Sequence, residues 1–272
     1  MRYKLLCVDV DGTLVNSNKE LPIENKKAIQ EAFKAGINIA IASGRSPGSV
    51  QEILDELEVE GYGICLNGSY IKHDNKEISR FVFNKNEIYK VCEIVKKYDV
   101  KAFFSTPFLN ITNKTPSANW LKAIQKSVVR QKELIVCNNE NLEEVLEEYS
   151  EIILKVSIME ENSDTYNKIK KDLEATGIFD VAKSDNHYVD VNVKGINKSK
   201  GVKDLAEYLN IDLSEVICIG DNENDIDMIK IAGLGVAMKN SCKKLLEICD
   251  EVTSSNDDFG VAKVIYDYLL KR

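Results

Sequence analysis

The sequence predicts a three-layer α/β core, in which helices cover both faces of a parallel β-sheet, with an α+β unit inserted into it. The first observation is that short apolar runs alternate with segments that carry apolar residues at helical spacing. The second is that this alternation occurs towards both ends of the chain, which indicates one core built from both halves. The third supports the insertion, because the middle of the chain is richer in Glu, Lys and Asn.

The first half supplies three strands and two helices of the predicted core. The strands are short apolar runs at residues 3–10, 37–42 and 63–66. The helices are apolar stripes at helical spacing within residues 28–33 and 50–57, the first of them closed by Gly36. Strands that alternate with amphipathic helices indicate βαβ units around a parallel sheet.

The same pattern resumes after the middle of the chain. We expect helices at residues 202–209, 225–231 and 261–270, and strands at residues 216–219 and 234–238. Between the two halves, helices are predicted at residues 87–98, 141–149 and 163–176, and strands at residues 101–104, 152–159 and 179–182. The expected division is therefore a discontinuous core of residues 1–83 and 188–272, with an inserted α+β domain at residues 84–187.

Composition excludes several classes of protein. The 272 residues carry 36 Lys and Arg against 44 Asp and Glu, a net charge of −8, which disfavours binding to nucleic acid. No run approaches the roughly 18 apolar residues of a membrane span, and two acids interrupt the N-terminal apolar run that a signal peptide would need. Seven singly placed cysteines are typical of a reducing compartment. We expect a cytoplasmic protein with no membrane, nucleic-acid or obligate protein partner.

Polar residues follow four of the predicted core strands. The segments are Asp9-Val10-Asp11-Gly12-Thr13, Ser43-Gly44-Arg45, Asn67-Gly68 and Gly220-Asp221-Asn222-Glu223-Asn224-Asp225. In an open parallel sheet, ligands bind beyond the carboxyl ends of the strands. These four groups are therefore expected to meet at one edge of the sheet.

Three carboxylates at this edge, those of Asp9, Asp11 and Asp221, would repel one another unless a cation neutralises them. Mg²⁺ takes oxygen ligands and leaves coordination positions for water and phosphate. Ser43 and the backbone amides after it are suited to phosphate oxygens, and Lys198 is placed in the sequence to balance the charge. The expected cofactor is therefore Mg²⁺, and the expected ligand is a phosphoryl group.

The same residues suggest a reaction. A carboxylate beside Mg²⁺ can attack phosphorus and form an aspartyl-phosphate, and a second carboxylic acid can protonate the leaving oxygen. Asp9 as the nucleophile and Asp11 as the general acid and base fit this division of roles. The cation and a lysine would stabilise charge in the transition state.

These motifs resemble those of the haloacid dehalogenase (HAD) superfamily of phosphohydrolases. Asp9-Val10-Asp11-Gly12-Thr13-Leu14 is similar to its first motif, Ser43-Gly44-Arg45 to the second, Lys198 to the third, and Gly220-Asp221-x-x-Asn224-Asp225 to the fourth. The insert lies where the Cof-type subfamily carries its α+β (type IIB) cap, and Asn67-Gly68 matches a Cof-type signature. The resemblance implies a Rossmann-like, HAD-like core.

The resemblance also implies roles for individual residues. Asp9 would be a metal ligand as well as the nucleophile, Asp11 would give its backbone carbonyl to the metal, and Asp221 would be the third ligand, with Asp225 supporting the metal site from nearby. The phosphoryl group would be held by Val10 (backbone), Ser43, Gly44, Lys198 and Asn224. Arg45 and Asn67 are interpreted as supporting residues near the site. Glycine usually follows the third-motif lysine, whereas Ser199 does here, so Lys200 is the reserve candidate for that role.

The predicted function is a Mg²⁺-dependent phosphatase acting on a small phosphorylated metabolite. Sugar phosphates are the first expectation, followed by flavin mononucleotide and pyridoxal phosphate. One alternative is a phosphomannomutase-like enzyme, which transfers the phosphate instead of releasing it. Another is a phospho-accepting signalling domain, although such domains are shorter and carry no insert of this size.

Overall fold

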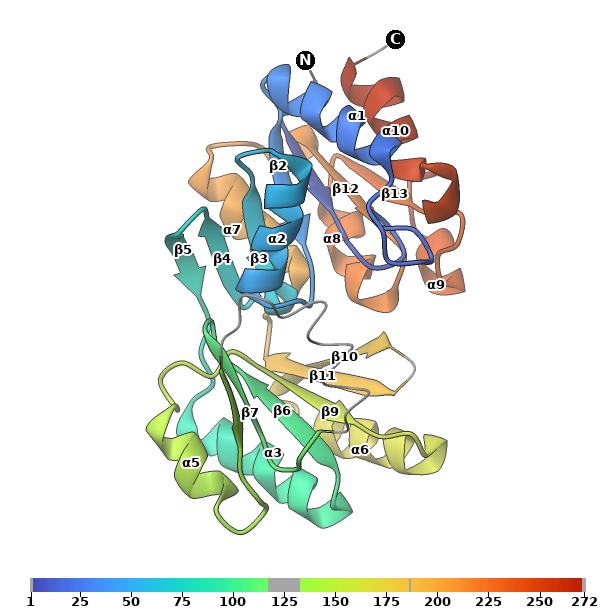
Figure 1. Ribbon diagram of the computed structural model, residues 1–272. Helices are drawn as coiled ribbons and strands as arrows, with labels where there is room; N and C mark the ends of the chain where they lie inside the picture. Colours follow the sequence, from blue (N-terminus) through green and yellow to red (C-terminus); the bar gives the residue numbers. More distant parts are fainter. Residues whose placement is uncertain (1, 117–132, 186, 271–272) are drawn as a thin grey trace.

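Two β-sheets organise the chain in the computed structural model, which describes residues 2–116, 133–185 and 187–270. The first sheet belongs to the core, which contains both ends of the chain. The second sheet belongs to the inserted unit, here called the cap, which lies beneath the core in Figure 1. The chain enters the cap after β5 (Lys76–Arg80) and returns to the core before α7 (Lys198–Tyr208).

The core sheet has eight strands in the order β14-β13-β12-β1-β2-β3-β4-β5. Its parallel strands are β1 (Leu5–Val8), β2 (Asn38–Ala42), β3 (Tyr62–Cys65), β12 (Val216–Gly220), β13 (Leu234–Ala237) and β14 (Glu251–Val252). The first strand, β1, pairs with both β12 and β2, so the loops that follow these three strands open side by side.

Helices cover both faces of the core sheet, as the predicted three layers require. One face packs against α1 (Ile23–Lys34), α2 (Pro47–Leu57), α10 (Gly260–Val264) and the final π-helical turn at Ile265–Leu270. The other face packs against α7, α8 (Ile226–Ile231) and α9 (Lys243–Leu246). Leu6 and Val8 face the first layer and Leu5 and Cys7 the second, the alternation expected of a strand buried on both sides.

The cap sheet has the order β10-β11-β9-β6-β7-β8. Its strands are β6 (Lys101–Ser105), β7 (Leu109–Thr112), β8 (Glu133–Val136), β9 (Lys155–Met159), β10 (Phe179–Asp185) and β11 (Tyr188–Val193). Three helices pack on one face of it: α3 (Lys85–Tyr98), α5 (Leu142–Glu148) and α6 (Ser163–Ala175). On β9 and β11, Lys155 and Asp190 face away from these helices and contact the core.

Several features differ from the sequence prediction, which did not include β7, β8, β11 or β14. The chain after β3 turns back as an antiparallel hairpin, β4 (Tyr70–His73) and β5, which extends the parallel sheet by two strands that were not predicted. The predicted insert ends at residue 187, yet β11 pairs with β9 and β10 within the cap sheet. We therefore propose that the return to the core lies after Val193.

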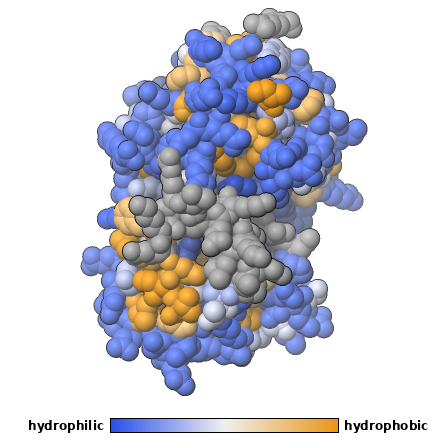
Figure 2. Space-filling view, in the orientation of Figure 1, coloured by the Kyte–Doolittle hydropathy of each residue, from blue (hydrophilic) through white to orange (hydrophobic). Residues whose placement is uncertain are grey.

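The surface in Figure 2 is mostly hydrophilic, with an apolar area at the lower left, on the cap. Among the residues that the structure describes, no helix is long and apolar enough to cross a membrane.

Candidate active site

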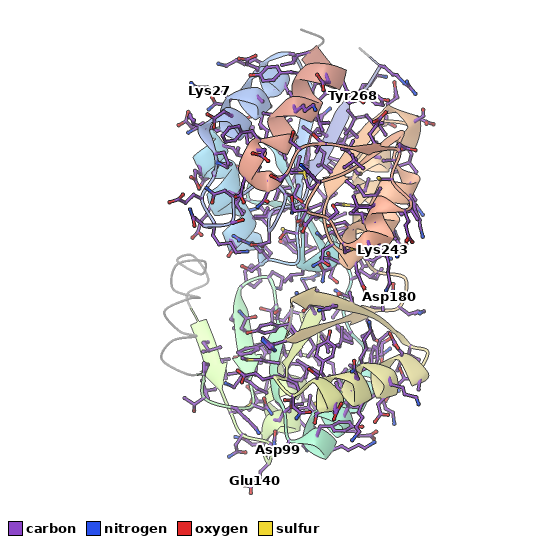
Figure 3. All side chains as sticks on the ribbon, turned by 90° about the vertical axis from the view of Figure 1, so that its right-hand side faces the viewer. Lys27, Asp99, Glu140, Asp180, Lys243 and Tyr268 are labelled. Carbon is purple, nitrogen blue, oxygen red and sulfur yellow. The ribbon has the colours of Figure 1, made fainter. Side chains whose placement is uncertain are left out.

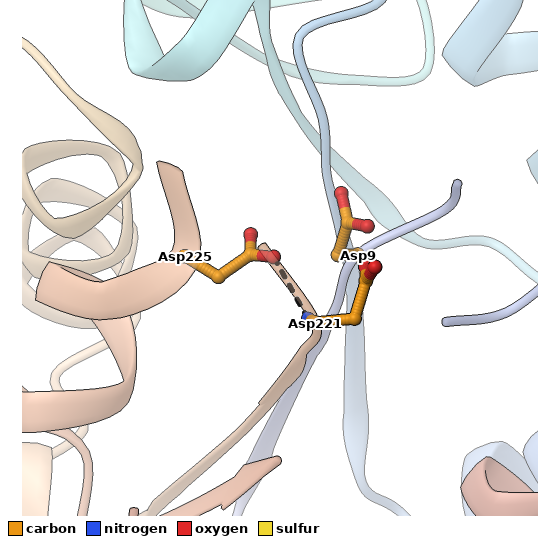
Figure 4. Close-up of side chains that lie close together, drawn as sticks. All are labelled: Asp9, Asp221 and Asp225. Atoms are coloured by element: carbon orange, nitrogen blue, oxygen red, sulfur yellow. Dashed lines mark hydrogen bonds between the residues drawn. The ribbon is translucent and has the colours of Figure 1, made fainter. Parts of the chain in front are cut away.

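The carboxyl ends of the core strands bring the predicted site residues together. Asp9 and Asp11 follow β1, Ser43 follows β2, and Asp221 follows β12. Asp225 ends the short helical turn η3 (Glu223–Asp225) after β12. Oxygen atoms of Asp9, Asp221 and Asp225 lie within 4.8 Å of one another, and Figure 4 shows the three side chains converging.

Lys198 is the cation at the centre of this group. Its Nζ donates to Oδ1 of Asp9 at 2.5 Å and to Oδ1 of Asp225 at 2.6 Å, and its side chain is 0% exposed. Asn197 caps the helix that Lys198 begins, accepting a hydrogen bond from the Lys200 amide, so the lysine is fixed at the first turn of α7. Lys200 instead pairs with Asp204 one helical turn on, away from the acids. The geometry therefore favours Lys198 over Lys200.

Asp221 is held by residues of the first motif. Thr13 Oγ1 donates to Asp221 Oδ1 at 3.0 Å, a role that the sequence analysis did not give to Thr13. Gly12 has a φ of +82°, and a Cβ there would lie 2.4 Å from Asp221 Oδ2. Only glycine meets both demands, because it tolerates positive φ and has no side chain to collide.

Asp225 fastens the loop instead of presenting free oxygens. Its Oδ2 accepts the backbone amides of Asp221 and Asn222, each at 3.0 Å, while its Oδ1 accepts from Lys198. Gly220 passes so close that a Cβ on it would lie 2.6 Å from the Asp225 side chain. Of the three acids, Asp9 and Asp221 are therefore the better placed to bind a metal ion, with Asp225 supporting them.

Burial and mutual repulsion set the protonation of these acids. Burial raises the pKa of Asp9 well above its ordinary value, and Asp225 and Asp221 add to this effect although the Lys198 charge opposes it. Burial and the Asp225 charge likewise raise the pKa of Asp221 to about 6, against the hydrogen bond from Thr13. Burial works against the charged form of Lys198, but Asp225 and Asp9 outweigh it and raise its pKa. A group of acids that resists ionisation in this way is suited to a divalent cation.

Asp11 is in a different environment. Arg45 donates to both of its oxygens, Nε to Oδ2 and Nη2 to Oδ1, each at 2.8 Å, and Lys19 donates to Oδ1 at 3.0 Å. Burial raises the pKa of Asp11, but the hydrogen bonds and charges of Arg45 and Lys19 prevail and lower it to about 2. Asp11 is therefore a carboxylate in this conformation, and Arg45 acts on it directly.

The loop after β2 lies at the same edge of the sheet as the acids. Ser43 is buried, and its Oγ accepts the Arg45 amide at 3.2 Å. Ser46 caps α2 by accepting the Ser49 amide, and Pro47 follows as its first residue, which fixes where the helix begins. The loop after β3 is tied to this one, because the Asn67 amide donates to the Ser43 carbonyl at 3.0 Å.

A polar cavity of about 350 Å³ adjoins these loops. Asn67, Lys198 and Asn224 line it from the core, and Asp180 and Lys194 line it from the cap. Figure 3 shows Asp180 at the boundary between the two units. The cavity is the size of a small ligand, and Lys198, which lines it, connects it to Asp9.

The cap also reaches the site through residues that the sequence analysis missed. Lys155 on β9 and Asp190 on β11 form an ion pair with an N–O distance of 2.6 Å. Lys155 Nζ also donates to the Gly44 carbonyl at 3.0 Å, and Asn67 Nδ2 donates to Asp190 Oδ2 at 2.9 Å. The available signal in the sequence was a charged residue within an apolar run, Lys155 before Val156 and Asp190 between Val189 and Val191.

The core topology, the cap inserted after β5 and the acids at the strand ends define a capped α/β hydrolase of the type that the motifs suggested. The chain matches the profile of the haloacid dehalogenase-like hydrolases over residues 6–265, and it belongs to that family. The resemblance inferred from the four motifs is thereby confirmed, and the protein is an enzyme.

Individual proteins of the family align over nearly the whole chain. YxeH of Bacillus subtilis is 32% identical over 282 residues, covering 99% of this chain and 100% of that protein. The 5-amino-6-(5-phospho-D-ribitylamino)uracil phosphatase YcsE of the same organism is 30% identical, covering 98% and 96%. A haloacid dehalogenase-like hydrolase structure from B. subtilis superposes with a TM-score of 0.87 at 25% identity, covering 98% of this chain and 100% of that one.

Proposed function

We propose that the protein is a Mg²⁺-dependent phosphatase that hydrolyses small phosphorylated metabolites through an aspartyl-phosphate intermediate. The observation that carries the proposal is the position of Asp9. Its buried carboxylate lies between the cation of Lys198 and the carboxylate of Asp221, at the carboxyl end of the central strand. This arrangement suits an acid that must be both a metal ligand and a nucleophile.

The donor set fits Mg²⁺. The carboxylates of Asp9 and Asp221 and the backbone carbonyl of Asp11 would hold the ion, with Asp225 anchoring the loop that carries Asp221. The raised pKa values of Asp9 and Asp221 support this set, because these acids lack sufficient positive charge nearby. When bound, Mg²⁺ supplies that charge and keeps the phosphoryl oxygens in place.

The reaction then needs two transfers of the phosphoryl group. Asp9 Oδ2 attacks phosphorus, the bond from phosphorus to the ester oxygen breaks, and Asp11 gives a proton to the leaving oxygen. Water next attacks the phosphorus of the aspartyl-phosphate and gives a proton to Asp11, the bond to Asp9 breaks, and phosphate leaves. Asp11 is unprotonated while it is paired with Arg45, so the first transfer requires Asp11 to separate from that guanidinium.

The phosphoryl oxygens would be held by groups from three loops. Lys198 supplies a charge from α7, and Ser43 and the amide of Gly44 supply donors from the loop after β2. The backbone of Val10 and the Asn224 side chain complete the set. Arg45 and Asn67 support it, Arg45 through Asp11 and Asn67 through the hydrogen bond from Asn224 at 3.4 Å.

The substrate is expected to be small and polar. The cavity is lined mainly by charged and amide side chains, with a few apolar residues such as Phe179, which suits sugar phosphates, flavin mononucleotide or pyridoxal phosphate. The relative YcsE is named as a phosphatase of a phosphorylated ribitylamino-uracil, which is also a polar metabolite.

The test is phosphate release from a panel of sugar phosphates, flavin mononucleotide and pyridoxal phosphate, with Mg²⁺ and with chelator. The variant is Asp9→Asn, which keeps the shape of the side chain but removes the nucleophile. The control is Asp172→Asn, because Asp172 lies on the cap surface and pairs with Lys97. Release that needs both Mg²⁺ and Asp9 supports the proposal, and equal release by Asp9→Asn refutes it. Formation of mannose 1-phosphate from mannose 6-phosphate would indicate transfer instead of hydrolysis.

A further inference from the structure

The Lys155–Asp190 ion pair lies on the face of the cap sheet that is turned towards the core. Val156 and Ile158 on β9 point into the cap interior, so Lys155 and Ser157 take the opposite face. The side chains of Lys155 and Asp190 are only 7% and 1% exposed. Asp190 is also held from its own sheet, because Ser157 Oγ donates to its Oδ1 at 2.7 Å.

The core covers this pair with two of its ligand-binding loops. Lys155 Nζ donates to the Gly44 carbonyl in the loop after β2 at 3.0 Å, and Asp190 Oδ2 accepts from Asn67 in the loop after β3 at 2.9 Å. A Cβ at position 44 would lie 2.9 Å from Asn67 Oδ1 and 3.4 Å from Lys155 Nζ, so the absence of a side chain lets these groups approach.

Asn67 extends the contact to the loop after β12. A carboxylate can only accept hydrogen bonds, so the Asn67 amide group must turn its nitrogen to Asp190. Its Oδ1 is then turned to Asn224, whose Nδ2 donates to it at 3.4 Å. The backbone of Asn67 is left-handed, with a φ of 57°, and its backbone N–H donates to the Ser43 carbonyl.

We propose that Lys155 is a positioning residue that, together with Asp190, couples closure of the cap to the shape of the phosphate-binding loops. This inference rests on the proposed phosphatase function. Both charges belong to the cap, so the pair persists when the cap moves away, but its hydrogen bonds to Gly44 and Asn67 exist only when the cap is closed. Closure thereby fixes the Gly44 carbonyl directly and the Asn224 amide through Asn67.

The pair has the physical properties that such a coupling needs. Two charges that leave water together require good geometry and extra hydrogen bonds, or their desolvation opposes closure. Here Ser157, Asn67 and the Gly44 carbonyl supply those bonds. Removing one charge should therefore do two separate things: leave an unpaired buried charge, which destabilises the protein, and release a loop of the site.

The experiment separates these two effects with Lys155→Met, Asp190→Asn and the double variant. The control is Lys96→Met, which removes another cap ion pair, that with Glu143, on the helical side. For each protein we would measure Tm and the kcat and KM for p-nitrophenyl phosphate with Mg²⁺, at a temperature where every variant is folded. Small-angle scattering with Mg²⁺ and inorganic phosphate would report how far the cap stays closed.

We expect Lys155→Met to lower kcat/KM by about 10- to 100-fold, the size of one lost hydrogen bond to a charged group, with a fall in kcat as well as a rise in KM. The double variant should recover most of the Tm without recovering kcat/KM. Recovery of both together, or no loss in Lys155→Met, overturns the inference. If the wild type itself releases no phosphate, the proposed function fails. The scattering measurement then tests the coupling by itself, and equal radii of gyration for the wild type and the double variant overturn it.

Discussion

Replacing Lys198 with methionine is the most direct test of the electrostatics of the site. Methionine is unbranched and of similar length, so Lys198→Met keeps most of the packing at the start of α7 and removes the charge. Lys198 Nζ donates to both Asp9 and Asp225, and its side chain is fully buried. Without it, three carboxylates within 4.8 Å would share no buried cation in the protein free of metal.

The expected loss is large. Removing one partner of a buried ion pair costs about 3–5 kcal/mol, because the remaining charge stays desolvated and unpaired. At roughly 2–4 °C per kcal/mol for a chain of this size, Tm should fall by about 10 °C in chelator. The deficit should shrink at pH 5, because the pKa values of Asp9 and Asp221 are already raised and protonation then removes the repulsion. Added Mg²⁺ should restore part of the stability without restoring activity.

The assay is thermal unfolding in chelator and in Mg²⁺, at pH 5 and pH 7.5, with Lys200→Met as the control. Lys200 lies two residues further along the same helix, is 38% exposed, pairs with Asp204 and lies over the Phe81 ring at 4.9 Å from its centroid. Its loss should cost less than about 1 kcal/mol, as is usual for pairs near the surface. Equal Tm values for the two variants in chelator at pH 7.5 would refute this account of the acid group.

Three further predictions follow from the charges around the site. In chelator, the raised pKa of Asp221 adds to the free energy of unfolding below about pH 4, and this contribution, some 3 kcal/mol, is lost as the pH rises through about 6. Mg²⁺ should therefore raise Tm more at pH 7.5 than at pH 5. Equal shifts in Tm at the two pH values would contradict this. Arg45→Met should raise the pKa of Asp11 from about 2 and move the acid-side inflection of kcat for p-nitrophenyl phosphate to higher pH, and an unchanged profile would exclude Asp11 as the base. The acids of the cavity, including Asp227, should favour a substrate with a neutral leaving group. We therefore expect kcat/KM for glucose 6-phosphate to exceed that for fructose 1,6-bisphosphate. Equal values at low salt would show that the charge of the cavity does not discriminate between these substrates.

The location of the site could be predicted because it depends on topology. Parallel strands place their carboxyl ends on one edge, so motifs after β1, β2 and β12 had to meet once those strands were recognised. Asp9, Asp221 and Lys198 come together as the sequence suggested.

Other features depend on contacts that a single sequence does not encode locally. The β4–β5 hairpin follows a loop where Leu66, Asn67 and Gly68 adopt positive φ, and the Asn67-Gly68 pair was interpreted as part of the site and not as a hairpin turn. We propose that the cap extends through β11, beyond the predicted boundary at residue 187, because β11 pairs with β9; no strand was predicted at these residues. The pairing of Asp11 with Arg45 needed the distance between two loops, which sequence separation does not give.

Lys155 and Asp190 were missed for a related reason, and their pairing bears on how the cap can work. A lone lysine from the cap beside the Gly44 carbonyl would add a positive charge next to the phosphoryl site, and it would hold the released phosphate as well as the substrate. Asp190 offsets that charge at 2.6 Å, while leaving the hydrogen bond to Gly44 intact. The proposed role of the Lys155–Asp190 pair is therefore to position the Gly44 loop without adding net charge beside the phosphoryl site. On this reasoning, Asp190→Asn should strengthen inhibition by inorganic phosphate, and weaker or unchanged inhibition would contradict it.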